Sequence, residues 1–429
     1  MATHTNQYNI PAPHRYTRRD LDSRLLETAC LARGMSIERY SRNYFSAERD
    51  EIKLACHLSS CSALVPHSAM TLCNRKNWTR HAMATADVPV PKGEAFGLRT
   101  RLLNPVEVLR YASSLGYPLV VKPEEGTKGA GVTVGVSSAA ELIRVMLGLW
   151  RERRVVIEEQ CSGQDYRFLV LGGQVISVLS RQAAQVIGNG ASSILALIEA
   201  ENESRSQNPR LRNSKIVVDA SLKGFVRKQY GCSLSHKPKP GEVIQLRSAA
   251  NISQGGAAKD ITDEVHASIK AVAVKACKAI PGLELAGVDM MIEDHHKPAS
   301  SQSCHVIEVN YRPAIGSHEF VSYGKPVSVS DLIVGHALHK LGCSDTSASD
   351  QSRRATFKVA FTGSSNNAAR HIQSILADCD LEFNPVARQS GNITFELTAL
   401  PETLSTVSTL LFVGKASRDI SHARVTVET

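Results

Sequence analysis

Two apolar segments near residue 300 carry polar side chains where a buried strand normally has none. The stretch HVIEVNYRPAIGSH (305–318) places Glu308 and Asn310 two residues apart, and the upstream stretch LAGVDMMIED carries Asp289. Alternate side chains of a strand share a face, so Glu308 and Asn310 point the same way, about 6–7 Å apart. If the strand with Asp289 pairs beside them, three oxygen ligands converge. The pattern therefore predicts two adjacent strands that carry a cation site.

Oxygen ligands of this kind suit Mg²⁺, which keeps several waters and bridges protein carboxylates to nucleotide phosphates. Burial of such acids without a cation or a hydrogen-bond donor is costly. A purely structural role for the three residues stays open at this point. The neighbouring pair His295 and His296, beside acidic residues, is typical of a polar loop tip and less so of a metal site.

Length and charge narrow the class of protein. A chain of 429 residues, 42% of them hydrophobic and 21% charged, suits two or three folded domains. Lys and Arg exceed Asp and Glu by 50 − 41 = 9, which favours anionic partners. Nucleic acid is a weaker expectation because the basic residues form no long run and only 5% of residues are aromatic.

The sequence also bears on location and redox chemistry. No apolar run approaches the roughly 18 residues that span a bilayer, and the first residues lack the apolar segment of a signal peptide, so we expect no membrane partner and a cytoplasmic location. The ten cysteines form no CxxC and no zinc-like spacing. They are therefore expected to be reduced, packed thiols, without a disulfide framework or zinc site.

Helix and strand patterns alternate along the chain. The segment from Leu21 predicts an amphipathic helix that ends at Gly34, YPLVVKP and RRVVIEEQ predict strands, and SSAAELIRVMLGLW predicts a helix with an N-cap Ser. After the polar segment SDTSASDQSRR, the order strand, helix, strand, strand, helix, strand favours a ferredoxin-like split βαβ module. The predicted organisation is a disordered arm (1–19), an N-terminal α/β lobe (20–74), a central domain (75–343), a linker (344–354) and a C-terminal βαββαβ module (355–429).

A glycine-rich loop follows the strand that ends at Lys122. In PLVVKPEEGTKGAGVTVGV the loop contains Gly126, Gly129 and Gly131, and a second β-rich run comes next. Glycines let backbone amides close on phosphate oxygens, and the lysine adds a fixed positive charge. Because a strand follows the loop, the P-loop and dinucleotide-binding patterns do not fit. A glycine-rich hairpin with a surface lysine remains an equal explanation.

The stretch VVIEEQCSGQDYRF (155–168) begins as an apolar strand and continues with acidic residues. Glu158 can accept a hydrogen bond from an adenine amino group, and Asp165 can hold ribose hydroxyls. A solvated acidic turn explains this segment alone at least as well.

These features occur in the order found in the ATP-grasp superfamily. Residues 70–335 resemble the ATP-grasp region of cyanophycin synthetases and bifunctional glutathione synthetases. The most specific match is LRSAANISQGGAAKDITDEVH (246–266), supported by AAQVIGNGASSI (183–194) and EVNYRPAIGSH (308–318). The resemblance implies an α+β, ATP-grasp fold in which two α+β subdomains hold ATP.

The resemblance also implies roles for individual residues. The nucleotide phosphates would contact Lys76, just before a helix, and Lys122, and the loop of Gly126, Gly129 and Gly131 would cover them; Glu158 would be the hinge acid and Asp165 the ribose-binding acid. The metal would be bound by Asp289, Glu308 and Asn310. The residues expected to stabilise the transferred phosphoryl group are Arg247, Asn251, Ser253, Gly255 and Gly256, and those expected to line the acceptor side are Arg167 and His318.

The implied reaction uses ATP with Mg²⁺, for which Mn²⁺ could substitute. ATP phosphorylates a substrate carboxylate, and an amine attacks the acyl phosphate to give an amide; amino acids or a small peptide are the expected substrates. Two alternatives are an ATP-grasp phosphotransferase that acts on a hydroxyl and a non-catalytic ATP-binding regulator. The intact metal positions Asp289, Glu308 and Asn310 favour the enzyme readings.

The chain departs from the family pattern at Gln254, Ala257, Lys259, Asn189 and Ala314, and several of these changes are expected in loops that face the substrate. We interpret them as a change of substrate rather than a loss of catalysis. The chain lacks the partner domains of both relatives, so a free-standing ligase is expected. The C-terminal module has two open roles, as a cap on the acceptor site or as the surface that makes a homo-oligomer.

Overall fold

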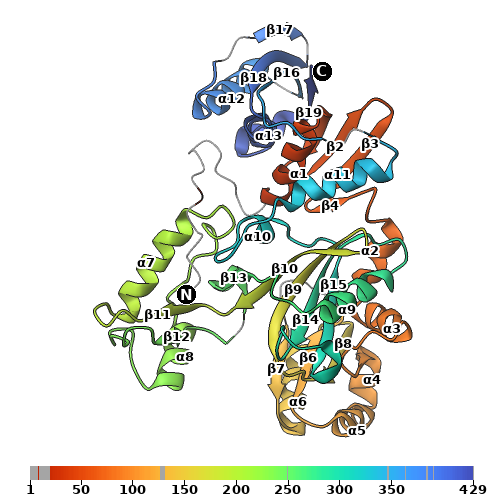
Figure 1. Cartoon of the computed structure of the whole chain (residues 1–429), viewed down its shortest axis with the longest axis vertical. Coiled ribbons are helices and arrows are strands. Elements are labelled where there is room, and N and C mark those ends of the chain that lie inside the picture. The colour runs from red at the N-terminus through yellow and green to blue at the C-terminus, as the bar shows by residue number, and fades with distance from the viewer. Residues whose placement is uncertain are drawn as a thin grey trace. The chain divides into compact units, whose positions relative to one another are not determined.

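The computed structural model describes residues 8, 20–125, 131–248, 250–344, 347–362, 364–382, 385–389 and 391–428 (Figure 1). Two compact units make up the chain. Unit 1 comprises Met1–Leu64, Leu179–Ile261 and Ala314–Thr429, and unit 2 comprises Val65–Val178 and Thr262–Pro313. Each unit is therefore assembled from segments that are distant in sequence.

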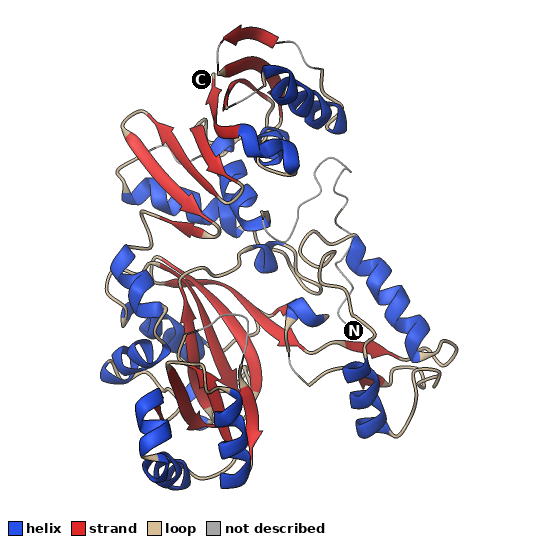
Figure 2. Cartoon of the chain, turned by 180° about the vertical axis from the view of Figure 1, so that it is seen from behind, coloured by secondary structure: helices blue, strands red, loops and turns tan. Residues whose placement is uncertain are grey.

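Unit 2 contains a four-stranded sheet in the order β5-β8-β6-β7, with antiparallel neighbours. Helices lie against one of its faces (Figure 2). The elements of this part are α2 (His67–Cys73), α3 (Lys76–Thr85), β5 (Gly93–Gly97), α4 (Leu98–Leu103), α5 (Pro105–Leu115), β6 (Leu119–Pro123), β7 (Thr133–Val136), α6 (Ala139–Gly148) and β8 (Arg154–Glu159).

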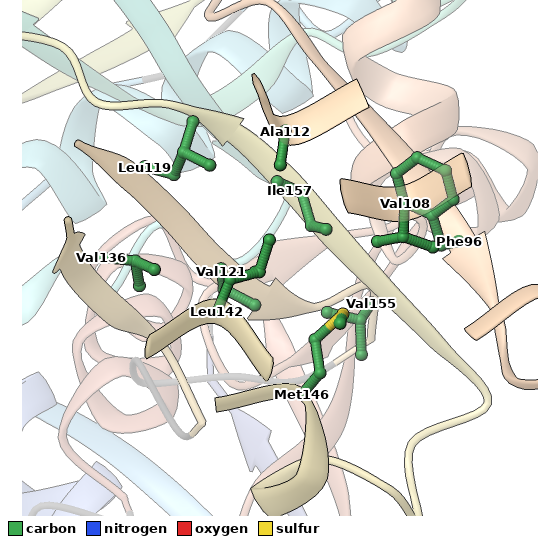
Figure 3. Close-up of a cluster of buried hydrophobic side chains, with 10 residues drawn as sticks. All are labelled: Phe96, Val108, Ala112, Leu119, Val121, Val136, Leu142, Met146, Val155 and Ile157. Carbon is green, nitrogen blue, oxygen red and sulfur yellow. The ribbon is translucent and has the colours of Figure 1, made fainter. Parts of the chain in front are cut away.

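An apolar core joins this sheet to α5 and α6. The buried side chains drawn in Figure 3 are Phe96, Val108, Ala112, Leu119, Val121, Val136, Leu142, Met146, Val155 and Ile157. Helix α6 begins at an N-cap, because the side chain of Ser138 accepts from the Glu141 amide; the Glu141 carboxylate accepts from Ser137, the residue before the cap. The strand alternation that turns Val121 and Ile157 toward the helices turns Lys122 and Glu158 to the opposite face of the sheet.

The second sheet of unit 2 has β14 (Leu285–Ile292) between β9 (Gln164–Leu171) and β15 (Cys304–Asn310), both antiparallel to it. Nearly every residue of β14 is buried, which explains its continuous apolar sequence. Helix α9 (Ala267–Lys278) packs on this sheet. Strand β10 (Gln174–Gln182) neighbours β9 and continues into unit 1 at Leu179.

Unit 1 contains an eight-stranded sheet in the order β17-β18-β16-β19-β1-β2-β3-β4. Strands from both ends of the chain meet in it, because β1 pairs with β19 at Ile37 and Val425 (Figure 1). The elements are α1 (Leu21–Ala32), β1 (Ser36–Ser41), β2 (Tyr44–Arg49), β3 (Ile52–His57), β4 (Ser60–Cys61), α11 (Val329–Lys340), β16 (Arg353–Phe361), α12 (Ser365–Asp378), β17 (Pro385–Gln389), β18 (Asn392–Ala399), α13 (Pro401–Leu410) and β19 (Ile420–Val427).

A buried ion pair stabilises the region where α1, β1 and α13 meet. The Arg39 guanidinium donates to both carboxylate oxygens of Glu27, at 3.2 and 2.6 Å, and both side chains are 0% exposed. Ser405 and Ser408 on α13 donate to the same carboxylate, at 2.7 and 2.8 Å. The N-terminal lobe and the C-terminal module are thus joined by a polar network as well as by the shared sheet.

The rest of unit 1 is a smaller region around the pair β11-β12. An apolar cluster that includes Ala184, Ile198, Ile216 and Val226 fills it. Its elements and the neighbouring short segments are β11 (Gln185–Ile187), α7 (Ile194–Ser206), α8 (Ala220–Tyr230), β12 (Val243–Gln245), the 3-10 turn η2 (Ile252–Gln254), β13 (Ala257–Asp260) and α10 (Gly316–Glu319). β13 pairs with the end of β10.

The predicted elements are largely found. β6, α6 with its Ser138 cap, β8 and the C-terminal order β16-α12-β17-β18-α13-β19 match the sequence patterns. The ferredoxin-like assignment of the last module stays a prediction. One placement was wrong: Lys76 is the first residue of α3 and does not precede the helix. In the part of the chain that the structure describes, no helix is both long and apolar enough to cross a membrane.

Candidate active site

Three neighbouring strands of unit 2 align a row of polar side chains. Asp289 on the central strand β14 lies opposite Arg167 of β9 and opposite Glu308 of β15. Asn310 lies opposite Gly287, where an added Cβ would come within 3.1 Å of Pro313. A bulge after Asp289 shifts the register of β15. The expected convergence of Asp289, Glu308 and Asn310 is thus present in the sheet.

The carboxylates of this row differ in how their charge is balanced. Arg167 donates to both oxygens of Asp289, each at 2.7 Å, and the Asn310 amide donates to one of them at 3.3 Å. Among the described residues, Glu308 has a longer ion pair, 3.9 Å from Lys76 Nζ. Burial, followed by the Asp289 carboxylate, raises the pKa of Glu308, against the opposing effects of Lys76, Lys122 and Arg167. A divalent cation fits this arrangement because it would stabilise the ionised form of Glu308 beside Asp289.

A second charged group lies on the open face of the four-stranded sheet. Lys122 Nζ donates to Glu158 at 2.5 Å, and both side chains are no more than 7% exposed. Arg80 on α3 lies 3.9 Å from the other Glu158 oxygen. Lys76 Nζ also donates to the Glu124 carbonyl at 3.4 Å. Three cationic side chains therefore lie near the neighbouring strands β6 and β8: Lys122 and Arg80 at Glu158, and Lys76 at the Glu124 carbonyl.

An open groove of about 830 Å³ borders this group. It is lined by α3 and by the segment 88–94, and it includes Arg80, Trp78 and Lys92. Sequence reasoning missed Arg80. Its position four residues after Lys76 was the available signal, because residues spaced by four share one face of a helix.

The loop predicted to cover the phosphates is partly described. Gly126 and Gly129 lie outside the described residues. Gly131 has φ +71°, and an added Cβ would come within 2.9 Å of the Pro123 ring, so the position requires glycine. Asp165 lies on β9 two residues before Arg167, on the same face of the strand.

The remaining predicted residues belong to unit 1. Arg247 donates to the Val217 carbonyl at 3.0 Å and to the Asp219 carboxylate at 2.9 Å. The Leu222 amide, which Asp219 caps, and then Arg247 lower the pKa of Asp219. This pairing fixes Arg247 against the start of α8.

A tight turn holds the glycines of the SQGG sequence. The amides of Gln254 and Gly256 both donate to the Asn251 carbonyl, at 2.9 and 3.0 Å. Gly255 has φ +96°, and a Cβ on Gly256 would meet the Gln182 carbonyl at 2.7 Å. Ser253 lies within this turn. The glycines are therefore required by the backbone itself.

Two further polar residues of unit 1 are fully buried. His318, on α10, is fully buried. Arg205 was not predicted: its buried guanidinium donates to the carbonyls of Ser214, at 3.2 and 2.7 Å, and of Gly256, at 3.1 Å, and so braces the glycine turn. The spacing of four between Glu201 and Arg205, whose charged groups lie 3.6 Å apart, was a signal for an ion pair along the helix, but the contacts with carbonyl groups leave no signal in the sequence.

Comparisons with known proteins give this geometry a family context. Cyanophycin synthetase of Geminocystis herdmanii is 33% identical over 264 residues, 60% of this chain and 29% of that protein. The glutathione biosynthesis bifunctional protein of Clostridium perfringens is 36% identical over 221 residues, 50% of this chain and 28% of that protein. A solved bifunctional glutathione synthetase from Pasteurella multocida aligns with a TM-score of 0.54 and 26% identity, covering 70% of this chain and 40% of that one.

The chain has the ATP-grasp fold. The resemblance drawn from the motifs is thereby confirmed. The chain spans less than a third of the length of the two curated relatives described above. No family model matches it. The ATP-grasp relatives form the background for the roles proposed next.

Proposed function

We propose that this chain is an ATP- and Mg²⁺-dependent ligase that joins a carboxylate to an amine through an acyl phosphate. The observation that carries the proposal is the row Arg167, Asp289, Glu308 and Asn310, in which the charge of one carboxylate is left poorly balanced. Relatives named as glutathione and cyanophycin synthetases support the reaction class.

In this proposal the residues of unit 2 hold the nucleotide. Asp289, Glu308 and Asn310 would hold Mg²⁺, which when bound neutralises phosphate charge. Lys76 and Lys122 would contact the phosphates, and Gly126, Gly129 and Gly131 would belong to the loop over them. Glu158 accepts a 2.5 Å hydrogen bond from Lys122 and would face the adenine, while Asp165 would hold the ribose. The protein contributes positions and charges, as phosphoryl transfer requires.

The remaining predicted residues are assigned to the transferred group and the acceptor. Arg247, Asn251 and the turn that follows it, which contains Ser253, Gly255 and Gly256, would stabilise charge that develops on the phosphoryl and acyl groups. Arg167 and His318 would serve the acceptor side. Because Arg167 holds Asp289 through two 2.7 Å bonds, it also positions a proposed metal ligand.

An assay of ADP release over panels of amino acids and short peptides, with mass spectrometry of the products, tests the proposal. ADP together with an amide product supports it. ADP with a phosphorylated hydroxyl would instead indicate a phosphotransferase, and nucleotide binding without turnover on any pair would indicate a regulator. Small-molecule carboxylates and amines, a cytoplasmic location and a homo-oligomeric state remain part of the proposal.

A further inference from the structure

A second group of ligand-type side chains in unit 2 shares no residue with the row of Asp289. Glu159 ends β8, Cys161 follows it by two residues, and His305 lies on β15. One carboxylate oxygen, the thiol sulfur and one imidazole nitrogen all lie within 4.8 Å of one another. All three residues are half-buried. The group thus combines three different donor types in one place.

Within the described part of the chain, the other contacts of these residues leave donor atoms available. Glu159 Oε1 accepts from the Lys92 amide at 2.8 Å, which orients the carboxylate and leaves its second oxygen. His305 Nδ1 lies 3.3 Å from the Ser303 hydroxyl, which orients the ring and leaves Nε2. Cys161 is a free thiol. Outer contacts of this kind fix the ligands of metal sites in proteins.

The chemistry of the group also suits a cation. It includes the Glu159 carboxylate beside the Cys161 thiol, and metals bind the thiolate form of cysteine.

We propose that Glu159, Cys161 and His305 bind a divalent cation of the zinc class, with a fourth position open to water. Sulfur, nitrogen and oxygen donors together favour Zn²⁺, whereas Mg²⁺ prefers oxygen donors alone. The edges of a tetrahedral zinc site are about 3.3–3.8 Å long. The donor atoms, now within 4.8 Å of one another, would have to approach by about 1 Å to reach these lengths, which side-chain rotations allow.

The three proposed ligands come from two different sheets of unit 2. Glu159 belongs to the four-stranded sheet and His305 to the sheet that contains β9, β14 and β15. Next to His305, the Pro89 carbonyl accepts from the Val306 amide at 2.8 Å. An ion here would connect the two sheets of unit 2 next to the Lys122–Glu158 pair. The site is distinct from the proposed Mg²⁺ site because it shares none of its ligands.

Cobalt substitution tests the site on the full chain without ATP or Mg²⁺, so its outcome is independent of ligase activity. After chelator treatment, one equivalent of Co²⁺ is expected to give visible bands of a tetrahedral ion and a thiolate charge-transfer band in the near ultraviolet, both displaced by Zn²⁺. Cys161→Ser removes the charge-transfer band, and His305→Gln weakens binding at least about tenfold. The half-buried Cys232 provides the control, since Cys232→Ser keeps the band.

Retention of the charge-transfer band in Cys161→Ser, or its loss in Cys232→Ser, would overturn the assignment. Circular dichroism shows whether each variant is folded. X-ray absorption at the zinc edge of the wild-type chain gives a readout without any variant: one sulfur with nitrogen and oxygen neighbours is expected. A zinc shell without sulfur, or no bound zinc at one equivalent, contradicts the proposal.

Discussion

Buried charge is handled in two different ways in the two units. In unit 1, Glu27 is 0% exposed and receives hydrogen bonds from Arg39, Ser405 and Ser408. In unit 2, Glu308 keeps 32% exposure of its side chain, and its ion pair with Lys76 is 3.9 Å long. The first carboxylate is satisfied within the protein, and the second is reachable and poorly balanced.

The contrast between Glu27 and Glu308 distinguishes an acid that stabilises the fold from an acid that serves a functional site. A buried acid with a full set of donors stabilises the fold, and loss of one partner leaves an uncompensated charge. An acid whose pKa is raised beside a second acid costs stability until a cation arrives, and such perturbed groups cluster at functional sites. The same comparison predicts opposite outcomes for removing the two charges.

Glu308→Gln is expected to have the largest effect on function. Turnover should fall at least about 10²–10³-fold, because one charged contact to the proposed metal is lost. Stability without Mg²⁺ should not fall, since the raised pKa of Glu308 shows that its charge is unfavourable in the folded state. Kinetics and thermal unfolding measure the two effects, and unchanged turnover would refute the metal assignment.

Glu27→Ala should have the opposite signature. We expect a loss of about 3–5 kcal/mol of unfolding free energy in urea, because the Arg39 charge loses its buried partner. The matched control is Glu27→Leu combined with Arg39→Met, which should recover most of the loss. A single variant as stable as the wild-type chain would show that the network is not structural.

Glu319 provides an intermediate case with a pH dependence. Burial raises its pKa to about 7, although the Ser330 amide donates to its carboxylate at 2.7 Å. Since the folded state holds this proton more tightly, the contribution to stability is complete below about pH 4.5 and is lost as the pH rises to about 7. Glu319→Gln should flatten this part of the stability profile. An identical slope in the variant would exclude Glu319 as its source.

Ser138→Ala tests a site with no buried charge and should have the smallest effect. Loss of the capping hydrogen bond to the Glu141 amide should cost about 1 kcal/mol. Turnover per folded molecule should stay unchanged, in contrast to Glu308→Gln. A loss of turnover beyond the unfolded fraction would link α6 to the site in a way that the structure does not show.

Local patterns predicted much of this molecule. The spacing of Glu308 and Asn310 and the apolar strand around Asp289 were enough to anticipate their convergence, because strand alternation is a local property. The bulge next to Asp289 was not visible in the sequence. The resemblance then supplied roles for residues whose types alone allowed several interpretations.

Long-range pairing could not be predicted in the same way. β1 and β19 pair across opposite ends of the chain, and nothing in either segment specifies its partner. For the same reason the proximity of Cys161 to His305 was missed, because motifs of zinc-binding cysteines relate only residues that are close in sequence. Arg205 escaped notice because it binds carbonyl groups, which every residue has.

The most direct test of the central claim is the thermal shift caused by ATP with and without Mg²⁺, in wild type and in Glu308→Gln. We predict that ATP with Mg²⁺ raises the unfolding temperature of the wild-type chain, that a chelator largely reverses the rise, and that Glu308→Gln shows little Mg²⁺-dependent part. A wild-type shift that is equal with and without Mg²⁺, or an unchanged Mg²⁺-dependent shift in Glu308→Gln, would contradict the account.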